Sequence, residues 1–157
     1  MSNIVVGQKL PEFEIVKGGV ATASGSFEAW GSDELEGQAV YFVANAGHGE
    51  SNDMHHETST KIQEAGDIRM CRIINAKDAP MGAGMFIKGE FKKAAVADES
   101  NLYIMDSKGV IAKELGMQKK GAVVAVLDAA GTVVYTHEGV VGTDEEAKIM
   151  EAIASVK

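Results

Sequence analysis

A dense group of side chains that could bind a metal or transfer protons lies in residues 48–57. Three histidines and three acids fall within ten positions there: His48, Glu50, Asp53, His55, His56 and Glu57. On a helix, Asp53 and His56 would share a face, and His48 in the preceding loop could complete a set of nitrogen and oxygen ligands. We predict a divalent metal site, for zinc or a similar ion, from His48, Asp53 and His56. The alternative is a solvated helix face with acids near the positive end of the helix dipole.

The same segment allows two further chemistries with weaker support. Gly47 and Gly49 leave backbone amides accessible to an anion, but the acids that follow already occupy the favourable field of the helix dipole. Ser51 could pair with His48 or His55 as a hydrolase nucleophile with its base. A serine at the start of a helix is, however, usually a cap.

The sequence holds a single cysteine, Cys71, which excludes an intramolecular disulfide and a dithiol–disulfide cycle within one chain. Cys71 lies in the apolar segment 68–74, which has the composition of a strand. A small thiol in such a segment is typically core filling. We predict that Cys71 is buried, and a peroxidase that uses this thiol is the disfavoured alternative.

A second candidate surface, residues 79–89, is rich in glycine and methionine. Gly82 and Gly84 resemble part of a phosphate-binding glycine loop, but the third glycine and the lysine of that motif are missing from the required positions, so the match is weak. Met81, Met85 and Phe86 could form an apolar lip that contacts a peptide or a partner, since methionine adapts to varied surfaces. Core filling by these side chains is the alternative.

Length and composition favour one globular domain, residues 1–157, because 45% of the residues are hydrophobic. A net charge of −8 without a basic stripe argues against nucleic acid and anionic lipid as partners. No apolar run is long enough for membrane insertion. The N-terminus lacks a basic region followed by an apolar stretch, which fits a cytosolic protein and equally an exported domain without its signal peptide.

Apolar periodicity predicts strands that alternate with helices, as in a mixed sheet covered on both faces. Strands are expected in six segments: 12–16, 39–44, 68–75, 102–105, 122–127 and 133–138. Gly18, Gly19 and residues 21–26 predict the turns of an N-terminal hairpin at the sheet edge. Residues 110–115 could form a short strand or a helix.

Three helices are expected, and capping residues indicate where two of them start. The first spans about 51–65, with Ser51 as its N-cap. The second begins in the glycine-rich segment and continues to about residue 97. The third begins at Thr143, with Glu146 at capping-box spacing.

Four segments resemble the YtfJ-like family of bacterial thioredoxin-fold proteins: 73–79, 82–87, 106–112 and 122–128. The resemblance extends over nearly the whole chain. It implies an α/β, thioredoxin-like fold related to glutaredoxins and peroxiredoxins, which is a three-layer α/β/α sandwich with a mixed central sheet, here with an N-terminal β-hairpin extension. Family members typically carry a secretion signal, so the resemblance implies a periplasmic protein, while the function of the family is not established.

The chain departs from redox-active thioredoxin folds at two places. Residues 47–50 hold no sulfur where such proteins carry Cys-x-x-Cys at a helix start. Redox members also have a cis-proline before the core strand, where this chain has Lys120 and Gly121. A cis bond without proline costs roughly 2.5–4 kcal/mol, so a trans peptide is expected there. Thiol exchange at this position is therefore not expected.

Two functional hypotheses remain from the sequence. The first is a non-redox binding or interaction module of the bacterial envelope, without a cofactor, that contacts an unknown protein or small molecule through the vacated thiol position and the glycine-rich segment. Its expected surface comprises eight residues: Gly47, Gly49, Glu50, Met81, Gly82, Gly84, Met85 and Phe86. The second is a thiol-independent enzyme or metal-binding protein centred on His48, Asp53 and His56.

Overall fold

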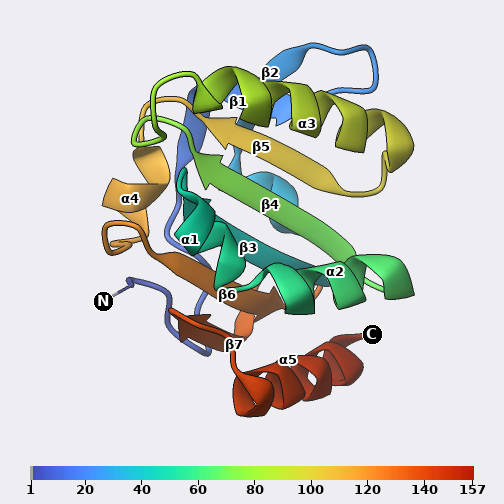
Figure 1. Ribbon diagram of the computed structural model, residues 1–157. Helices are drawn as coiled ribbons and strands as arrows, with labels where there is room; N and C mark the ends of the chain where they lie inside the picture. The colour runs from blue at the N-terminus through green and yellow to red at the C-terminus, as the bar shows by residue number, and fades with distance from the viewer. Residues whose placement is uncertain (1) are drawn as a thin grey trace.

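The computed structural model describes residues 2–157 and has a seven-stranded mixed sheet at its centre (Figure 1). The strand order is β2-β1-β5-β4-β3-β6-β7. The three central strands β3, β4 and β5 run parallel, and the outer strands pair antiparallel. The strands are β1 (Glu14–Ala21), β2 (Phe27–Gly31), β3 (Val40–Ala46), β4 (Arg69–Asn75), β5 (Leu102–Asp106), β6 (Ala122–Leu127) and β7 (Val133–Glu138).

Helices lie on both faces of this sheet and make the three layers that the sequence predicted (Figure 1). They are a 3-10 helix, η1 (Ser32–Leu35), and the α-helices α1 (Gly49–Asp53), α2 (His56–Ala65), α3 (Ala83–Ala97), α4 (Val110–Glu114) and α5 (Thr143–Val156). Helices α2, α3 and α5 pack on one face, and α4, η1 and the N-terminal segment pack on the other. None of the helices in residues 2–157 combines the length and the apolar character needed to cross a bilayer.

Strand β3 is buried along its whole length, because apolar side chains leave it toward both helix layers. Phe42 belongs to the core under α4 and η1, and Tyr41 belongs to the core under α2, α3 and α5. Cys71 on the neighbouring strand lies in the first core and has no exposed surface, which confirms that it is buried.

The N-terminal hairpin lies at the edge of the sheet, as expected, and its strand β1 pairs with β5. The first strand of the hairpin is longer than the sequence indicated. Gly18 and Gly19 were expected in a turn, yet both lie inside β1 with φ angles of +89° and +97°. A Cβ on Gly18 would lie 2.1 Å from the carbonyl oxygen of Met105 on the paired strand β5. These glycines are therefore required by a close backbone approach within the sheet, not by a turn.

The helix predicted over 51–65 is broken into α1 and α2, which is a correction to the sequence interpretation. The break lies at Met54 and His55, where His55 has φ −128° and ψ −7° and its side chain is buried. The carbonyl oxygen of Met54 accepts a hydrogen bond from the N–H of Val141, 2.8 Å away, in place of a helical partner. Asp53 thus ends one helix and His56 begins the next, so they do not share one helical face.

Two capping predictions are also corrected. Ser51 lies inside α1, and the residue before that helix is His48. Helix α5 begins at Thr143 itself, and the carboxylate of Glu145 accepts the N–H of Gly142 at 3.0 Å. Glu146, expected in that role, instead accepts hydrogen bonds from side chains of α2, which ties α5 to α2.

Candidate functional site

A cavity of about 460 Å³ opens at the carboxyl ends of β3 and β4 and is lined by residues of α1 and α3. We call it the α1–α3 cleft. Apolar side chains make much of its wall, including Ile74 of β4 and Phe86, Ile87 and Phe91 of α3. The carboxyl ends of parallel strands are where open α/β sheets commonly bind ligands, and a volume of this size is within the usual range for small molecules.

The cleft joins two segments that the sequence singled out separately. Five of the predicted residues line it together: Gly47, His48, Gly49, His56 and Phe86. The loop between β3 and α1 supplies Gly47 and His48, and Gly49 is the first residue of α1. His56 begins α2, and Phe86 lies in the first turn of α3.

The other predicted surface residues lie outside the cavity wall. Glu50 is exposed and lies 3.7 Å from the ammonium of Lys120, in an ion pair too exposed to contribute much stability. Met81 and Met85 are exposed, at 105% and 83% of their full surface, so they do not fill the core. Gly82 and Gly84 adjoin them at the start of α3 without lining the cleft.

The predicted metal ligands are not brought together. His48 and His56 line the α1–α3 cleft, whereas Asp53 lines a separate hollow that faces the start of α5. No three His, Cys, Asp or Glu side chains within residues 2–157 form a group that could hold a metal ion. The break between α1 and α2 explains this, because the prediction assumed one continuous helix.

The position of the missing thiol is sterically closed by the chain that follows β4. A Cβ added to Gly47 would lie 2.6 Å from the carbonyl oxygen of Asn75 and 2.7 Å from the Cβ of Ala79. The N–H of Gly47 also donates to the carboxylate of Asp78 at 2.9 Å. A side chain at this place, cysteine included, would displace the loop, so more than a sulfur atom separates this site from a redox site.

The second departure from redox folds is as expected. The described residues contain no cis peptide bond, so the peptide between Lys120 and Gly121 is trans. Lys120 adopts a positive φ of 54°, the only non-glycine residue among 2–157 to do so.

Arg72 is a residue of the cleft that the sequence reasoning missed. It lies in the middle of β4, half-buried, and its Nη2 donates to Oδ1 of Asn52. Its guanidinium lies 5.7 Å from the ring centroid of Phe91, at cation–π distance. Burial lowers the pKa of Arg72, as expected for a cation withdrawn from water. The signal that could have identified it was a charge at the centre of the mostly apolar run 68–74, flanked by Cys71 and Ile73.

Beneath the cleft, four polar side chains form a buried hydrogen-bonded chain. His55 lies 2.9 Å from Oδ1 of Asn45 through Nε2 and 2.8 Å from Oγ of Ser59 through Nδ1, and Ser59 lies 2.9 Å from the hydroxyl of Tyr41. The amide nitrogen of Asn45 donates to a backbone carbonyl, so its Oδ1 accepts from His55 and the imidazole carries its proton on Nε2. Tyr41 then donates to Ser59, and Ser59 donates to Nδ1.

Burial keeps the imidazole of His55 neutral. Burial lowers the pKa of His55 from the ordinary 6.5 to about 3, and the charges of Arg72 and His56 act in the same direction. Burial also raises the pKa of Tyr41 to about 12, so its hydroxyl stays a donor. The chain joins β3 to α2 and fixes the break that aims His55 inward.

The hydrolase pairing proposed for Ser51 is not formed. The Oγ of Ser51 is buried and makes no hydrogen bond within residues 2–157. Both ring nitrogens of His55 are already bonded to other side chains. Ser51 therefore has no general base in this arrangement.

Cys71 should resist modification in the native protein. Burial raises the pKa of its thiol, and the side chain has no exposed surface. We expect Ellman's reagent to leave the native protein unlabelled and to titrate one thiol per chain in guanidinium chloride. Rapid labelling without denaturant would contradict the buried placement.

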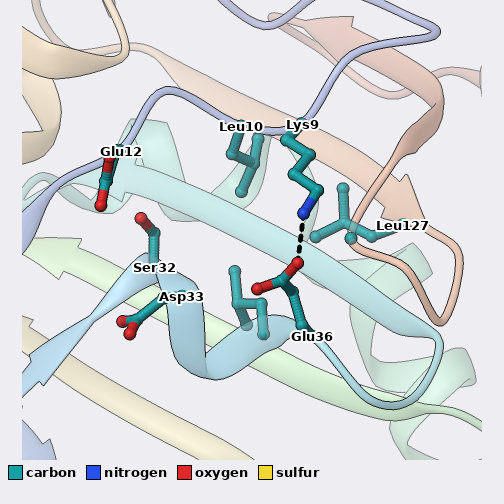
Figure 2. Close-up of a pocket in the computed structure, with 9 residues that line it drawn as sticks. Lys9, Leu10, Glu12, Ser32, Asp33, Glu36 and Leu127 are labelled. Atoms are coloured by element: carbon teal, nitrogen blue, oxygen red, sulfur yellow. Dashed lines mark hydrogen bonds and ion pairs between the residues drawn. The ribbon is translucent and has the colours of Figure 1, made fainter.

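A second cavity, of about 300 Å³, lies between the N-terminal segment and η1 and shares no lining residue with the α1–α3 cleft. Figure 2 shows Lys9 reaching across it to form an ion pair with Glu36. Ser32 accepts the N–H of Phe13 at 3.0 Å there, which fastens the N-terminal segment to η1. None of the predicted site residues lines this cavity. The contacts of Lys9 with Glu36 and of Phe13 with Ser32 hold the N-terminal segment against η1, which is a structural role.

Comparisons with solved structures show a thioredoxin-like fold. A Chlorobium tepidum protein assigned as a thiol:disulfide interchange protein, DsbE, superposes with a TM-score of 0.62 at 19% identity, over 98% of this chain and 99% of its own. The 2-Cys peroxiredoxin of Plasmodium vivax gives a TM-score of 0.59 at 14% identity, over 96% of both chains. At these identities the likeness establishes the fold, which confirms the predicted fold class, and nothing about activity.

Comparisons of sequence identify the family. An uncharacterized protein of Haemophilus influenzae is 28% identical over 144 residues, covering 87% of this chain and 78% of its own length. The uncharacterized protein YtfJ of Escherichia coli is 23% identical over 154 residues, covering 94% of this chain and 84% of its own. The model of a family described as "Bacterial protein of unknown function (YtfJ_HI0045)" matches residues 4–156. The chain therefore belongs to the YtfJ family, a bacterial family with a thioredoxin-like fold that is here without a Cys-x-x-Cys motif.

Proposed function

We propose that this protein is a non-redox binding module of the bacterial envelope, which holds an apolar ligand in the α1–α3 cleft. The observation that carries the proposal is the convergence of residues 47–49 and of Phe86 on one cavity, at the end of the sheet where this fold otherwise places its thiols. The ligand would be a free small molecule or a group presented by a partner protein. The envelope belongs to the proposal because members of the family typically carry a secretion signal.

Two features support binding over thiol chemistry. Gly47 leaves no space for a side chain at the position of the missing thiol. The lone thiol of Cys71 is buried in the core under α4 and η1, on the opposite face of the sheet. Much of the wall of the cleft is apolar, and Phe86 keeps 70% of its surface exposed there. An exposed aromatic side chain at the mouth of a cavity is a typical anchor for a ligand.

The proposal is tested with a neutral probe, 3-phenylpropanamide, titrated into ¹⁵N-labelled protein. We expect saturable shifts of the backbone amides of His48 and of residues 84–87. The affinity should be in the millimolar range, if the probe gains about 0.3 kcal/mol per heavy atom, the value usual for drug-sized ligands.

A matched pair of variants on α3 makes the test specific. Phe86→Ala should weaken the binding of 3-phenylpropanamide several-fold, because Phe86 lines the cleft. Val96→Ala should not, because Val96 is also exposed on α3 but lies outside the cleft. Shifts confined to other parts of the protein, or equal effects of the two variants, would contradict the proposal.

A further inference from the structure

Arg72 brings a positive charge to the cleft without an acidic partner. In the described part of the chain, no Asp or Glu forms an ion pair with its guanidinium. Its Nε is sealed from solvent and has no hydrogen-bond acceptor there. Withdrawing a guanidinium from water without a counter-charge is costly, so an apolar sheet face is a poor place for it unless an anion binds there.

The free donors of Arg72 belong to the end of its side chain. Nη2 uses one N–H on Asn52, and Nη1 makes no hydrogen bond within residues 2–157 and is not sealed from solvent. The contacts with Asn52 and with the ring of Phe91 hold the guanidinium in place before any ligand arrives. A planar fork of donors fixed in this way suits a carboxylate, which accepts two parallel hydrogen bonds.

The surroundings of Arg72 indicate the rest of the ligand. Ile74, Phe86 and Ile87 line the same cleft and would pack against an apolar body. One guanidinium matches one negative charge, and the net charge of −8 disfavours a ligand with more. Glu90 lines the cleft from α3 but is exposed and forms no ion pair with Arg72.

We infer that the ligand of the α1–α3 cleft is a small organic acid, whose carboxylate pairs with Arg72 and whose apolar body packs against Phe86 and Ile87. This inference rests on the proposed function and adds to it the charge class of the ligand. A cavity of about 460 Å³ accommodates such a molecule. The acidic protein surface would repel a dianion more strongly than a monoanion.

The test compares two probes of the same shape, 3-phenylpropanoate and the neutral 3-phenylpropanamide, by the ¹⁵N titration described above. In the wild type we expect the acid to bind at least ten-fold more tightly than the amide. Arg72→Met should remove this preference and leave the binding of the amide unchanged. Arg72→Lys should keep part of the preference, because it keeps the charge and loses the fork.

Glu90→Gln is the matched control, because it changes a charge on the rim and not the guanidinium. It should leave the preference for the acid intact or increase it, whereas a loss of that preference would overturn the inference. Equal affinities of acid and amide in the wild type, both at the cleft, would overturn the inference and leave the proposed function standing. Absence of cleft shifts with either probe would remove the proposed function as well.

A further arm distinguishes a free acid from the terminus of a polypeptide. N-acetyl-Ala-Phe with a free carboxylate is compared with its C-terminal amide on the wild type and on Arg72→Met. Binding of 3-phenylpropanoate at least as tight as that of the peptide acid supports a small organic acid. Binding of the peptide acid alone, lost in Arg72→Met, would overturn that assignment in favour of a protein C-terminus.

Discussion

Substitution of Gly47 by alanine is expected to lower the free energy of unfolding by about 2–3 kcal/mol, the upper part of the usual range for overpacking. The new Cβ would lie 2.6 Å from the carbonyl oxygen of Asn75 and within 2.9 Å of two atoms of Ala79. The oxygen of Asn75 and the Cα of Ala79 are backbone atoms, so no side-chain rotation can relieve the clash. Urea unfolding followed by circular dichroism measures the change.

Gly49→Ala is the control for this prediction. No atom lies within 4 Å of the place its Cβ would take, so its effect should stay within about 0.5 kcal/mol, as for an ordinary surface substitution. If Gly47→Ala were as stable as Gly49→Ala, the vacated thiol position would be open, and the loss of thiol chemistry would reflect only a missing sulfur.

Acid should destabilise the protein through His55. Its pKa is about 3 in the folded state and 6.5 ordinarily, so the unfolded chain takes up a proton between these values and the folded chain does not. Stability contributed by the neutral histidine is thus complete above pH 6.5 and is lost as the pH falls toward 3. From pH 7 to pH 5 the free energy of unfolding should fall by about 2 kcal/mol from this group alone.

Two histidine variants isolate the contribution of His55. In His55→Gln, the free energy of unfolding should fall much less between pH 7 and pH 5 than in the wild type, as measured by urea unfolding at both pH values. His56→Gln should retain it, because His56 is exposed. A wild type whose stability is the same at pH 5 and pH 7 would contradict the buried neutral state of His55.

Much of the fold could be predicted because its strands are apolar and its helices are amphipathic. The runs that became β3 and β6 are buried on both sides and could not be mistaken for surface segments. Gly18 and Gly19 misled the prediction because glycine marks turns and close backbone approaches alike, and the sequence cannot show that β5 lies against β1.

The candidate site was predictable in its location and less so in its residues. The sequence indicated the start of the helix after β3 and the segment around Phe86, and both line the cleft. The predicted metal ligands depended on a continuous helix, but the helix breaks where His55 turns inward, donating to Asn45 and accepting from Ser59. Helical periodicity describes contacts within one helix, so it could not predict the contact of His55 with Asn45 on β3.

Arg72 was missed for a related reason. In the sequence it stands between the apolar residues Cys71 and Ile73. The alternation of a strand predicts only which face of the sheet a side chain lies on, and not which helix covers it there. Only the fold places it beside Asn52 of α1 and Phe91 of α3, so that a strand residue becomes part of the cleft.

A crystal structure of the protein saturated with 3-phenylpropanoate would show directly whether the α1–α3 cleft binds an acid through Arg72. We predict density in the cleft, with a carboxylate oxygen about 2.7–2.9 Å from Nη1 of Arg72, the usual length of a charge-assisted hydrogen bond. The phenyl ring should contact Phe86 or Ile87. An empty cleft at saturating concentration, or the acid bound instead beside Lys9 in the second cavity, would contradict the claim.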